Sequence, residues 1–151
     1  MKLPMTGGCQ CGAVRYEVTA EPLTLYCCHC TECQKQSASA FGMSMPVREE
    51  TLHVTQGAPR RWVRAAASGA PVDCHFCGEC GTRLFQASAR NPGVLVVKPG
   101  TLDDTSWLVP IGHIWAGSAQ PWMRDCLDGL VEYAQPDGLA GLRTAWRERG
   151  R

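Results

Sequence analysis

The sequence has little excess charge and no long apolar run. Its 15 basic residues nearly balance its 14 acidic residues, so the formal net charge is +1. This balance gives no global field that would attract nucleic acid or a membrane surface, and we expect neither as a partner. No stretch approaches the ~18 apolar residues that a membrane helix needs. Small molecules are therefore the better expectation for what the chain binds.

The N-terminal segment MKLPMTGGCQCGAV lacks the apolar core of a secretory signal peptide. We therefore expect a cytoplasmic protein, in a compartment that keeps thiols reduced. No internal repeat and no low-complexity linker divides the 151 residues, a length that suits one domain. The sequence assigns no oligomeric state.

Helical patterns are scarce, and short strand patterns dominate the chain. Val14, Tyr16 and Val18 alternate with polar residues, which is the period of a half-buried strand. Glycine and proline turns separate further candidates. These candidate strands are 23–27, 41–47, 51–57, 60–66, 82–88, 93–100 and 108–115. Many short strands between such turns favour a mainly β, antiparallel fold.

Two short helices are expected beside these strands. One follows Cys30 and covers residues 31–38. The other lies in the C-terminal tail, where Leu139, Leu142 and Trp146 recur at helical spacing behind an expected Asp137 cap. We interpret this apolar stripe as a packing surface.

Ten cysteines need an explanation other than core-building. In a reducing compartment such a pattern indicates metal binding or catalysis rather than disulfides. Cys9 and Cys11 would face the same side of a strand, and Cys77 and Cys80 form a CxxC turn with a glycine after each cysteine. Together the four thiolates can close a structural tetrahedral zinc site. The alternative is two unrelated thiol pairs in a reduced core.

The stretch YCCHCTEC holds a second set, formed by Cys28, Cys30 and Cys33. The first two would share a strand face, and Cys33 would lie in the first helical turn, whose N–H groups favour a thiolate. Zinc with three protein ligands keeps a fourth position for water or substrate, which is the catalytic arrangement.

A fourth protein ligand would close this second site. Four residues are candidates for that role: Cys27, His29, Cys74 and His75. On a strand, Cys27 and His29 point away from Cys28, which favours the open site. Cysteines outside both sets are expected to be small buried hydrophobic residues, namely Cys27, Cys74 and Cys126.

Five segments match a known family in order and spacing: GGCQCGAVRYEV, CCHCTECQKQSASAFG, FCGECGTRLF, VKPGTLDD and PIGHIWAGSAQPW. From about Thr6 to Trp122 the chain resembles the glutathione-dependent formaldehyde-activating (GFA) enzymes and the related centromere protein V. The resemblance implies a β-tent of small antiparallel sheets stabilised by two zinc ions. Cys9, Cys11, Cys77 and Cys80 would hold the structural ion, and Cys28, Cys30 and Cys33 the catalytic one.

The resemblance also implies a function and a domain boundary. The family reaction is that of a carbon-sulfur lyase, which reversibly joins formaldehyde and glutathione as S-hydroxymethylglutathione. A zinc-binding β domain would cover residues 1–126, with residues 127–151 as a tail whose helix packs on it. Two positions depart from the family pattern: Ala38, where members often carry glycine, and Cys74-His75, where members more often carry a non-ligand.

Substrate contacts are the least specified part of this hypothesis. His113 in GHIW is the candidate for acid-base help or substrate binding. Four basic residues are candidates for the glutathione carboxylates: Arg60, Arg61, Arg64 and Lys98. The alternatives are a zinc module that binds a small thiol or a protein partner without turnover, and a lyase that acts on another thiol or electrophile.

Overall fold

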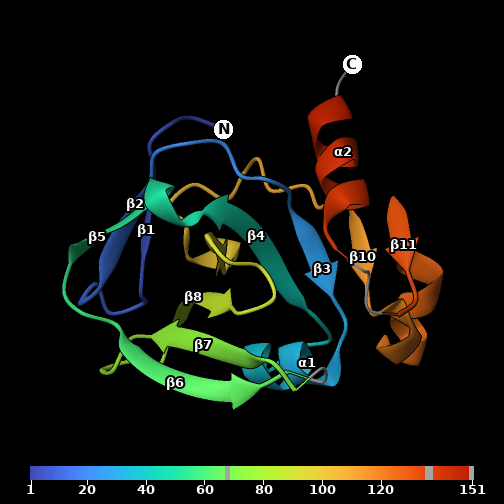
Figure 1. Cartoon of the computed structure of the whole chain (residues 1–151), viewed down its shortest axis with the longest axis horizontal. Coiled ribbons are helices and arrows are strands. Elements are labelled where there is room, and N and C mark those ends of the chain that lie inside the picture. Colours follow the sequence, from blue (N-terminus) through green and yellow to red (C-terminus); the bar gives the residue numbers. More distant parts are fainter. Residues whose placement is uncertain (67–68, 135–137, 150–151) are drawn as a thin grey trace. The chain divides into compact units, whose positions relative to one another are not determined.

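The computed structural model describes residues 1–66, 69–134 and 138–149 (Figure 1). The fold is mainly β with few short helices, as the sequence predicts. The chain forms two compact units, each made of two segments of sequence. Unit 1 comprises Met1–Pro22 and Pro46–Trp107, and unit 2 comprises Leu23–Met45 and Leu108–Arg151. The expected boundary between residues 126 and 127 stays a prediction.

Unit 1 contains two antiparallel ladders. The first has the order β1-β2-β5, and the second joins β6, β7, β8 and β9 as consecutive neighbours. The strands are β1 (Met5–Gly8), β2 (Arg15–Val18), β5 (Leu52–Gln56), β6 (Arg60–Ala65), β7 (Pro71–Phe76), β8 (Arg83–Ser88) and β9 (Val94–Val97). Single 3-10 turns are η1 (Glu49–Thr51) and η2 (Pro99–Thr101).

The predicted alternation in β2 is borne out by burial. Tyr16 and Val18 are almost fully buried, whereas Arg15 and Glu17, which alternate with them, are partly exposed. Burying such apolar side chains stabilises the fold by roughly 1.5–3 kcal/mol each. β2 pairs with β1 in antiparallel fashion, so the turn of residues 9–12 lies at the end of this two-stranded ladder.

Unit 2 has the strand order β11-β10-β3-β4. Its strands are β3 (Tyr26–Cys28), β10 (Gly112–Ile114), β11 (Leu130–Glu132) and the beginning of β4 (Gly42–Arg48). β3 pairs with β4 in antiparallel fashion, but β10 pairs with both β3 and β11 in parallel. The expectation of antiparallel sheets is therefore wrong for β10. Long connections, which parallel pairing requires, separate it from both neighbours.

The helix after Cys30 is confirmed as α1 (Thr31–Ser37). Its N-cap is Cys30, whose Sγ accepts a hydrogen bond from the N–H of Cys33 at 3.4 Å. Its C-cap is Ala38, with a left-handed φ of 48°. Glycine adopts this conformation at lower cost than alanine.

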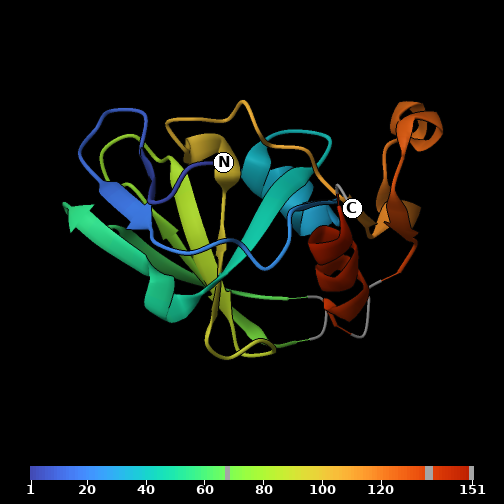
Figure 2. The ribbon, with the colours of Figure 1, turned by 90° about the horizontal axis from the view of Figure 1, so that it is seen from above.

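The tail helix is α2 (Ala140–Glu148), red in Figures 1 and 2. Leu142 and Trp146 are buried and Leu139 is half-buried, which confirms that the stripe packs. Leu142 joins a buried cluster with Tyr26, Cys28, Cys33 and Ile114. The N-cap is Leu139, without a side-chain hydrogen bond, and the expected cap Asp137 lies outside the described residues.

Two further 3-10 segments lie in unit 2, η3 (Ala116–Ser118) and η4 (Pro121–Cys126). Among the helices described, none combines the length and apolar character needed to cross a membrane.

Candidate metal centres

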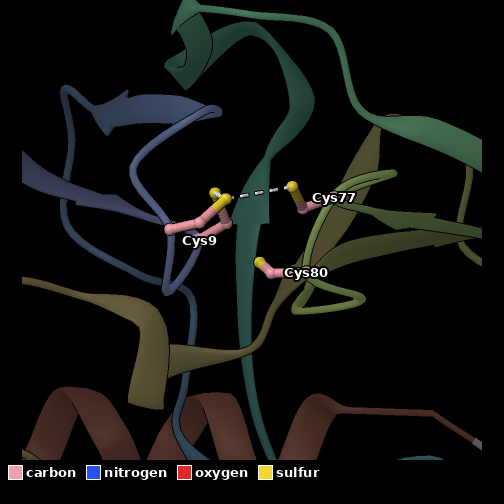
Figure 3. A group of neighbouring side chains, drawn as sticks. Cys9, Cys77 and Cys80 are labelled. Atoms are coloured by element: carbon pink, nitrogen blue, oxygen red, sulfur yellow. Dashed lines mark hydrogen bonds between the residues drawn. The ribbon is translucent and has the colours of Figure 1, made fainter.

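Four sulfurs of unit 1 converge on one point (Figure 3). The Sγ atoms of Cys9, Cys11, Cys77 and Cys80 all lie within 4.8 Å of one another. Cys9 Sγ is 3.5 Å from Cys11 Sγ, which is 3.8 Å from Cys77 Sγ. Tetrahedral zinc with Zn–S distances of about 2.3 Å places its sulfurs about 3.8 Å apart. None of the ten cysteines, all of which lie in the described residues, forms a disulfide, and these four fit such an ion.

Two turns of the same design present these sulfurs. The N–H of Gly12 donates to the carbonyl of Cys9, and the N–H of Gly81 donates to that of Cys77, each at 3.0 Å. Both glycines have left-handed backbones, with φ of 79° and 73°. Cys9 and Cys11 therefore lie in a turn after β1, and the expectation that they share a strand face is wrong. The turn achieves the same convergence because its closing hydrogen bond folds Cys11 back toward Cys9.

Hydrogen bonds to sulfur favour the thiolates of two members of this cluster, Cys9 and Cys80. The N–H of Val14 donates to Cys9 Sγ at 3.2 Å. The hydroxyl of Thr82, 3.2 Å from Cys80 Sγ, and then the backbone hydrogen bonds of Thr82 and Cys11 lower the pKa of the Cys80 thiol to about 5. A lowered thiol pKa favours metal binding because the ligand is the thiolate.

Three sulfurs of unit 2 form a second cluster. Cys28, Cys30 and Cys33 lie within 4.8 Å of one another. Cys28 ends β3, whereas Cys30 is the N-cap of α1 and Cys33 lies in its first turn. The predicted strand face shared by Cys28 and Cys30 is therefore wrong, because the strand ends before Cys30. The bend from strand to helix aims all three side chains inward.

The three neighbouring thiols make it unfavourable for all of them to ionise without a bound cation. The sulfurs of Cys30 and Cys33, and then burial, raise the pKa of the Cys28 thiol well above its usual range. Three adjacent thiolates repel one another, so they can ionise together only around a positive charge. The donor set thus suits a thiophilic ion such as zinc.

No fourth donor completes this cluster among the described residues. His29 is fully buried and its ring contacts His113 instead. In unit 1, Cys74 is buried in β7, and His75 stacks on Phe85 with ring centroids 4.6 Å apart. Burial of Cys27 and Cys74 is as predicted. Cys126 is exposed, so its predicted burial is wrong, because it ends the surface segment η4.

A buried histidine pair leads to a surface carboxylate. His29 Nε2 lies 2.9 Å from His113 Nδ1, and His113 Nε2 lies 3.4 Å from Asp128 Oδ1. Both imidazoles are buried, whereas 94% of the Asp128 side chain is exposed. Burial and then the neighbouring His113 lower the pKa of His29. Sequence reasoning treated His29 only as a ligand candidate and missed both the pair and Asp128. The pair depends on the parallel register that places His113 beside Cys27, which no local sequence pattern predicts.

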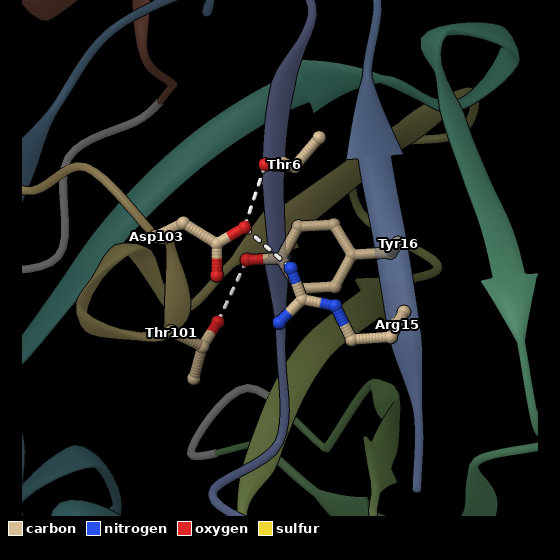
Figure 4. A network of polar contacts seen from close by, with 5 residues as sticks. All are labelled: Thr6, Arg15, Tyr16, Thr101 and Asp103. Atoms are coloured by element: carbon tan, nitrogen blue, oxygen red, sulfur yellow. Dashed lines mark hydrogen bonds and ion pairs between the residues drawn. The ribbon is translucent and has the colours of Figure 1, made fainter. Parts of the chain in front are cut away.

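Polar contacts join η2 and the segment after it to β1 and β2 (Figure 4). The carboxylate of Asp103 accepts from Thr6 Oγ1 at 2.6 Å and pairs with the guanidinium of Arg15. Tyr16 and Thr101 share a hydrogen bond of 2.7 Å between their hydroxyls. Burial raises the pKa of Tyr16 to about 12. These contacts hold both strands that flank the turn of Cys9 and Cys11, and no local sequence pattern predicted them.

The sequence pattern of the glutathione-dependent formaldehyde-activating enzymes matches residues 4–118. The chain belongs to this family. A Halomonas elongata protein, provisionally named as such an enzyme, is 30% identical over 93 residues, which are 58% of this chain. The match spans 59% of that relative's length. A crystal structure of a Rhodobacter sphaeroides protein is 25% identical, with a TM-score of 0.55, and the match covers 70% of this chain and 98% of that one.

The GFA match includes every member of both cysteine clusters as well as His113, and it ends before Asp128. Arg60, Arg61 and Arg64, also within it, lie on β6, and Lys98 is the N-cap of η2. The part of the chain that matches the family therefore contains both cysteine groups that can hold metal ions.

Proposed function

We propose that the protein is a zinc-dependent carbon-sulfur lyase of the GFA type. It would reversibly join glutathione, or a similar small thiol, to formaldehyde or another small electrophile at the three-cysteine cluster. The observation that carries this proposal is the convergence of Cys28, Cys30 and Cys33 without a fourth donor among the described residues, in a chain of this family.

Two zinc ions are proposed, with different roles. Cys9, Cys11, Cys77 and Cys80 would hold a structural ion, since four sulfurs complete a tetrahedron. Cys28, Cys30 and Cys33 would hold the other and leave one coordination position. A zinc ion there supplies thiol activation, because a sulfur that it coordinates loses its proton near neutral pH.

The three cysteinates suit a nucleophilic sulfur better than a polarised carbonyl. Their three negative charges exceed the two positive charges of a zinc ion, which weakens any Lewis acidity toward an aldehyde. The N–H of Cys33, donated to Cys30 Sγ, offsets part of this charge at the start of α1. The chain's contribution is then to bind the thiol and hold it in place for attack.

His113 is proposed to help on the substrate side. Its Nδ1 is hydrogen-bonded to His29. Its Nε2 contacts the exposed carboxylate of Asp128 at 3.4 Å, a partner that a substrate can replace. Because that contact is long and Asp128 is solvated, a substrate hydroxyl could replace it at small cost. Cytoplasmic location and the arginine contacts to glutathione remain predictions.

Exchange spectroscopy with formaldehyde and glutathione tests this function. The rate at which free and glutathione-bound formaldehyde interconvert should rise when the pure protein is added. Cys28→Ala should remove the increase, whereas Cys126→Ala, which changes an exposed cysteine outside both clusters, should retain it. An unchanged rate with wild-type protein would contradict the proposal. If glutathione nevertheless bound, the thiol-binding module without turnover would be the correct alternative.

A further inference from the structure

β6 forms an open edge of its ladder (Figure 1). It pairs with β7 on one side, and the described part of the chain places no strand on the other. Its side chains are largely exposed, including Trp62 at 54% and Val63 at 43%. An uncovered edge with exposed apolar side chains is a template for adding another strand.

The hairpin fixes which backbone groups face this open edge. The N–H of Ala66 donates to the carbonyl of Ala70 at 2.8 Å, so these residues form a hydrogen-bonded antiparallel pair. Such pairs alternate with non-hydrogen-bonded ones along the ladder. With Ala65 opposite Pro71, the register directs the N–H and C=O groups of Arg61, Val63 and Ala65 away from β7. Pro71, which has no N–H, fits its non-hydrogen-bonded position.

The side chains of β6 give this edge a positive charge. Arg60, Trp62 and Arg64 share one face, because alternate residues of a strand point the same way. On the other face Arg61 is neutralised by Asp73 at 2.6 Å. Neither Arg60 nor Arg64 has a carboxylate within ion-pair distance in the described residues. Arg64 Nη1 donates to the carbonyl of its neighbour Ala65 at 3.3 Å, and Arg64 Nε is buried without a hydrogen-bond partner.

We propose that β6 binds an extended acidic peptide segment of another protein as an additional strand. The N–H and C=O groups of Arg61 and Val63, and the N–H of Ala65, would supply the backbone hydrogen bonds, as in other cases of strand addition. Arg60 and Arg64 would meet carboxylates on the same face, and Trp62 between them would cover an apolar side chain. A second copy of the chain is a poorer occupant. Each copy would bring three arginines and a single carboxylate, already paired with Arg61, so the positive charges of the two copies would repel each other.

Amide hydrogen exchange with two model peptides tests this surface. The peptides are end-blocked, equal in length, and alternate valine with either glutamate or lysine. The glutamate peptide should slow exchange at the amides of Arg61, Val63 and Ala65. The amides of Trp62 and Arg64, which already face β7, should change little. The lysine peptide should have no effect.

Two variants at one position separate backbone from side-chain effects. Val63→Pro removes an N–H that faces the open edge but retains the hydrogen bonds to β7, so it should abolish binding of the glutamate peptide. Val63→Ala is the matched control and should retain binding. Should Val63→Pro fail to fold, Arg60→Glu combined with Arg64→Glu, both on an exposed strand, should transfer binding to the lysine peptide.

Several results would overturn the proposal. These are no binding of the glutamate peptide to wild-type protein, equal binding of both peptides, or full binding by folded Val63→Pro. Sedimentation that shows a dimer lost in Val63→Pro would assign the edge to a second copy instead.

Discussion

Cys11 Sγ lies 3.8 Å from Cys77 Sγ, although 66 residues separate the two cysteines in sequence. The contact closes unit 1 by joining the turn after β1 to the turn between β7 and β8. A shared metal ion would make this closure part of the folding free energy, because the unfolded chain has no such site.

Cys77→Ser should therefore strongly destabilise the protein. Zinc binding contributes on the order of 10 kcal/mol to the folding of small zinc peptides. Cys30→Ser should be milder, since its cluster lies on β3 and α1, which also pack through apolar contacts. Thermal unfolding of both variants and of Cys126→Ser, as the exposed control, measures this order. The reverse order would show that the two roles are exchanged.

Metal analysis of protein purified without chelator should give close to two zinc ions per chain. A mild chelator should first remove the ion of the three-cysteine cluster, because three protein sulfurs should bind zinc with lower affinity than four. A thiol reagent should then modify Cys28, Cys30 and Cys33 before the other cluster. One tightly held ion, with these three cysteines reactive from the start, would contradict the assignment.

The absence of a side chain at Gly42 should be needed for Cys33 to keep its position in the three-cysteine cluster. It is paired with Cys28 across the strands, and a Cβ built on it would lie 3.2 Å from Cys33 Cβ. Gly42→Ala should therefore displace Cys33 slightly and weaken metal binding there by about 10-fold, the lower end for residues that support ligands. Gly100→Ala, which places its methyl in open space, is the control. A competition assay with equal affinities for both variants would refute this effect.

Asp103 should make a pH-dependent contribution to stability. Arg15, and then Thr6, lower the pKa of this carboxyl in the folded protein. A lowered folded-state pKa stabilises the protein above the unfolded-state value of about 3.9, and this contribution is lost as the pH falls through the folded-state pKa. Wild type should therefore exceed Asp103→Asn in denaturant midpoint at pH 7, and the difference should shrink below pH 4. A difference independent of pH would refute the linkage.

Periodicity and spacing predicted the mainly β class, the helix after Cys30 and the membership of both cysteine clusters. Two strands were predictable from local sequence: β2, where apolar and polar residues alternate, and β9, which is a short continuous apolar run. Two strands, β7 and β11, were missed, and the N-terminal strand was expected at Cys9 and Cys11 rather than at β1. β1 contains two glycines and β7 begins with proline, and both features normally indicate turns. Pairing partners rather than local sequence make these segments strands.

The local geometry of the clusters was less predictable than their membership. The prediction used strand alternation for Cys9 and Cys11 and again for Cys28 and Cys30. The structure uses a glycine turn for the first pair and a helix N-cap for the second. The His29–His113 pair depends on parallel pairing between segments 84 residues apart, which no local pattern reveals.

Cobalt substitution tests most directly whether the three-cysteine cluster accepts a thiol. With cobalt bound by Cys28, Cys30 and Cys33, the visible absorption should change when glutathione is added, as a fourth sulfur enters. S-methylglutathione, which has no ionisable thiol, should leave the spectrum unchanged. Cys28→Ala should remove the response while the four-cysteine cluster retains its metal. If this cluster already has an all-sulfur spectrum without glutathione, a fourth protein sulfur closes it, and the lyase assignment is contradicted.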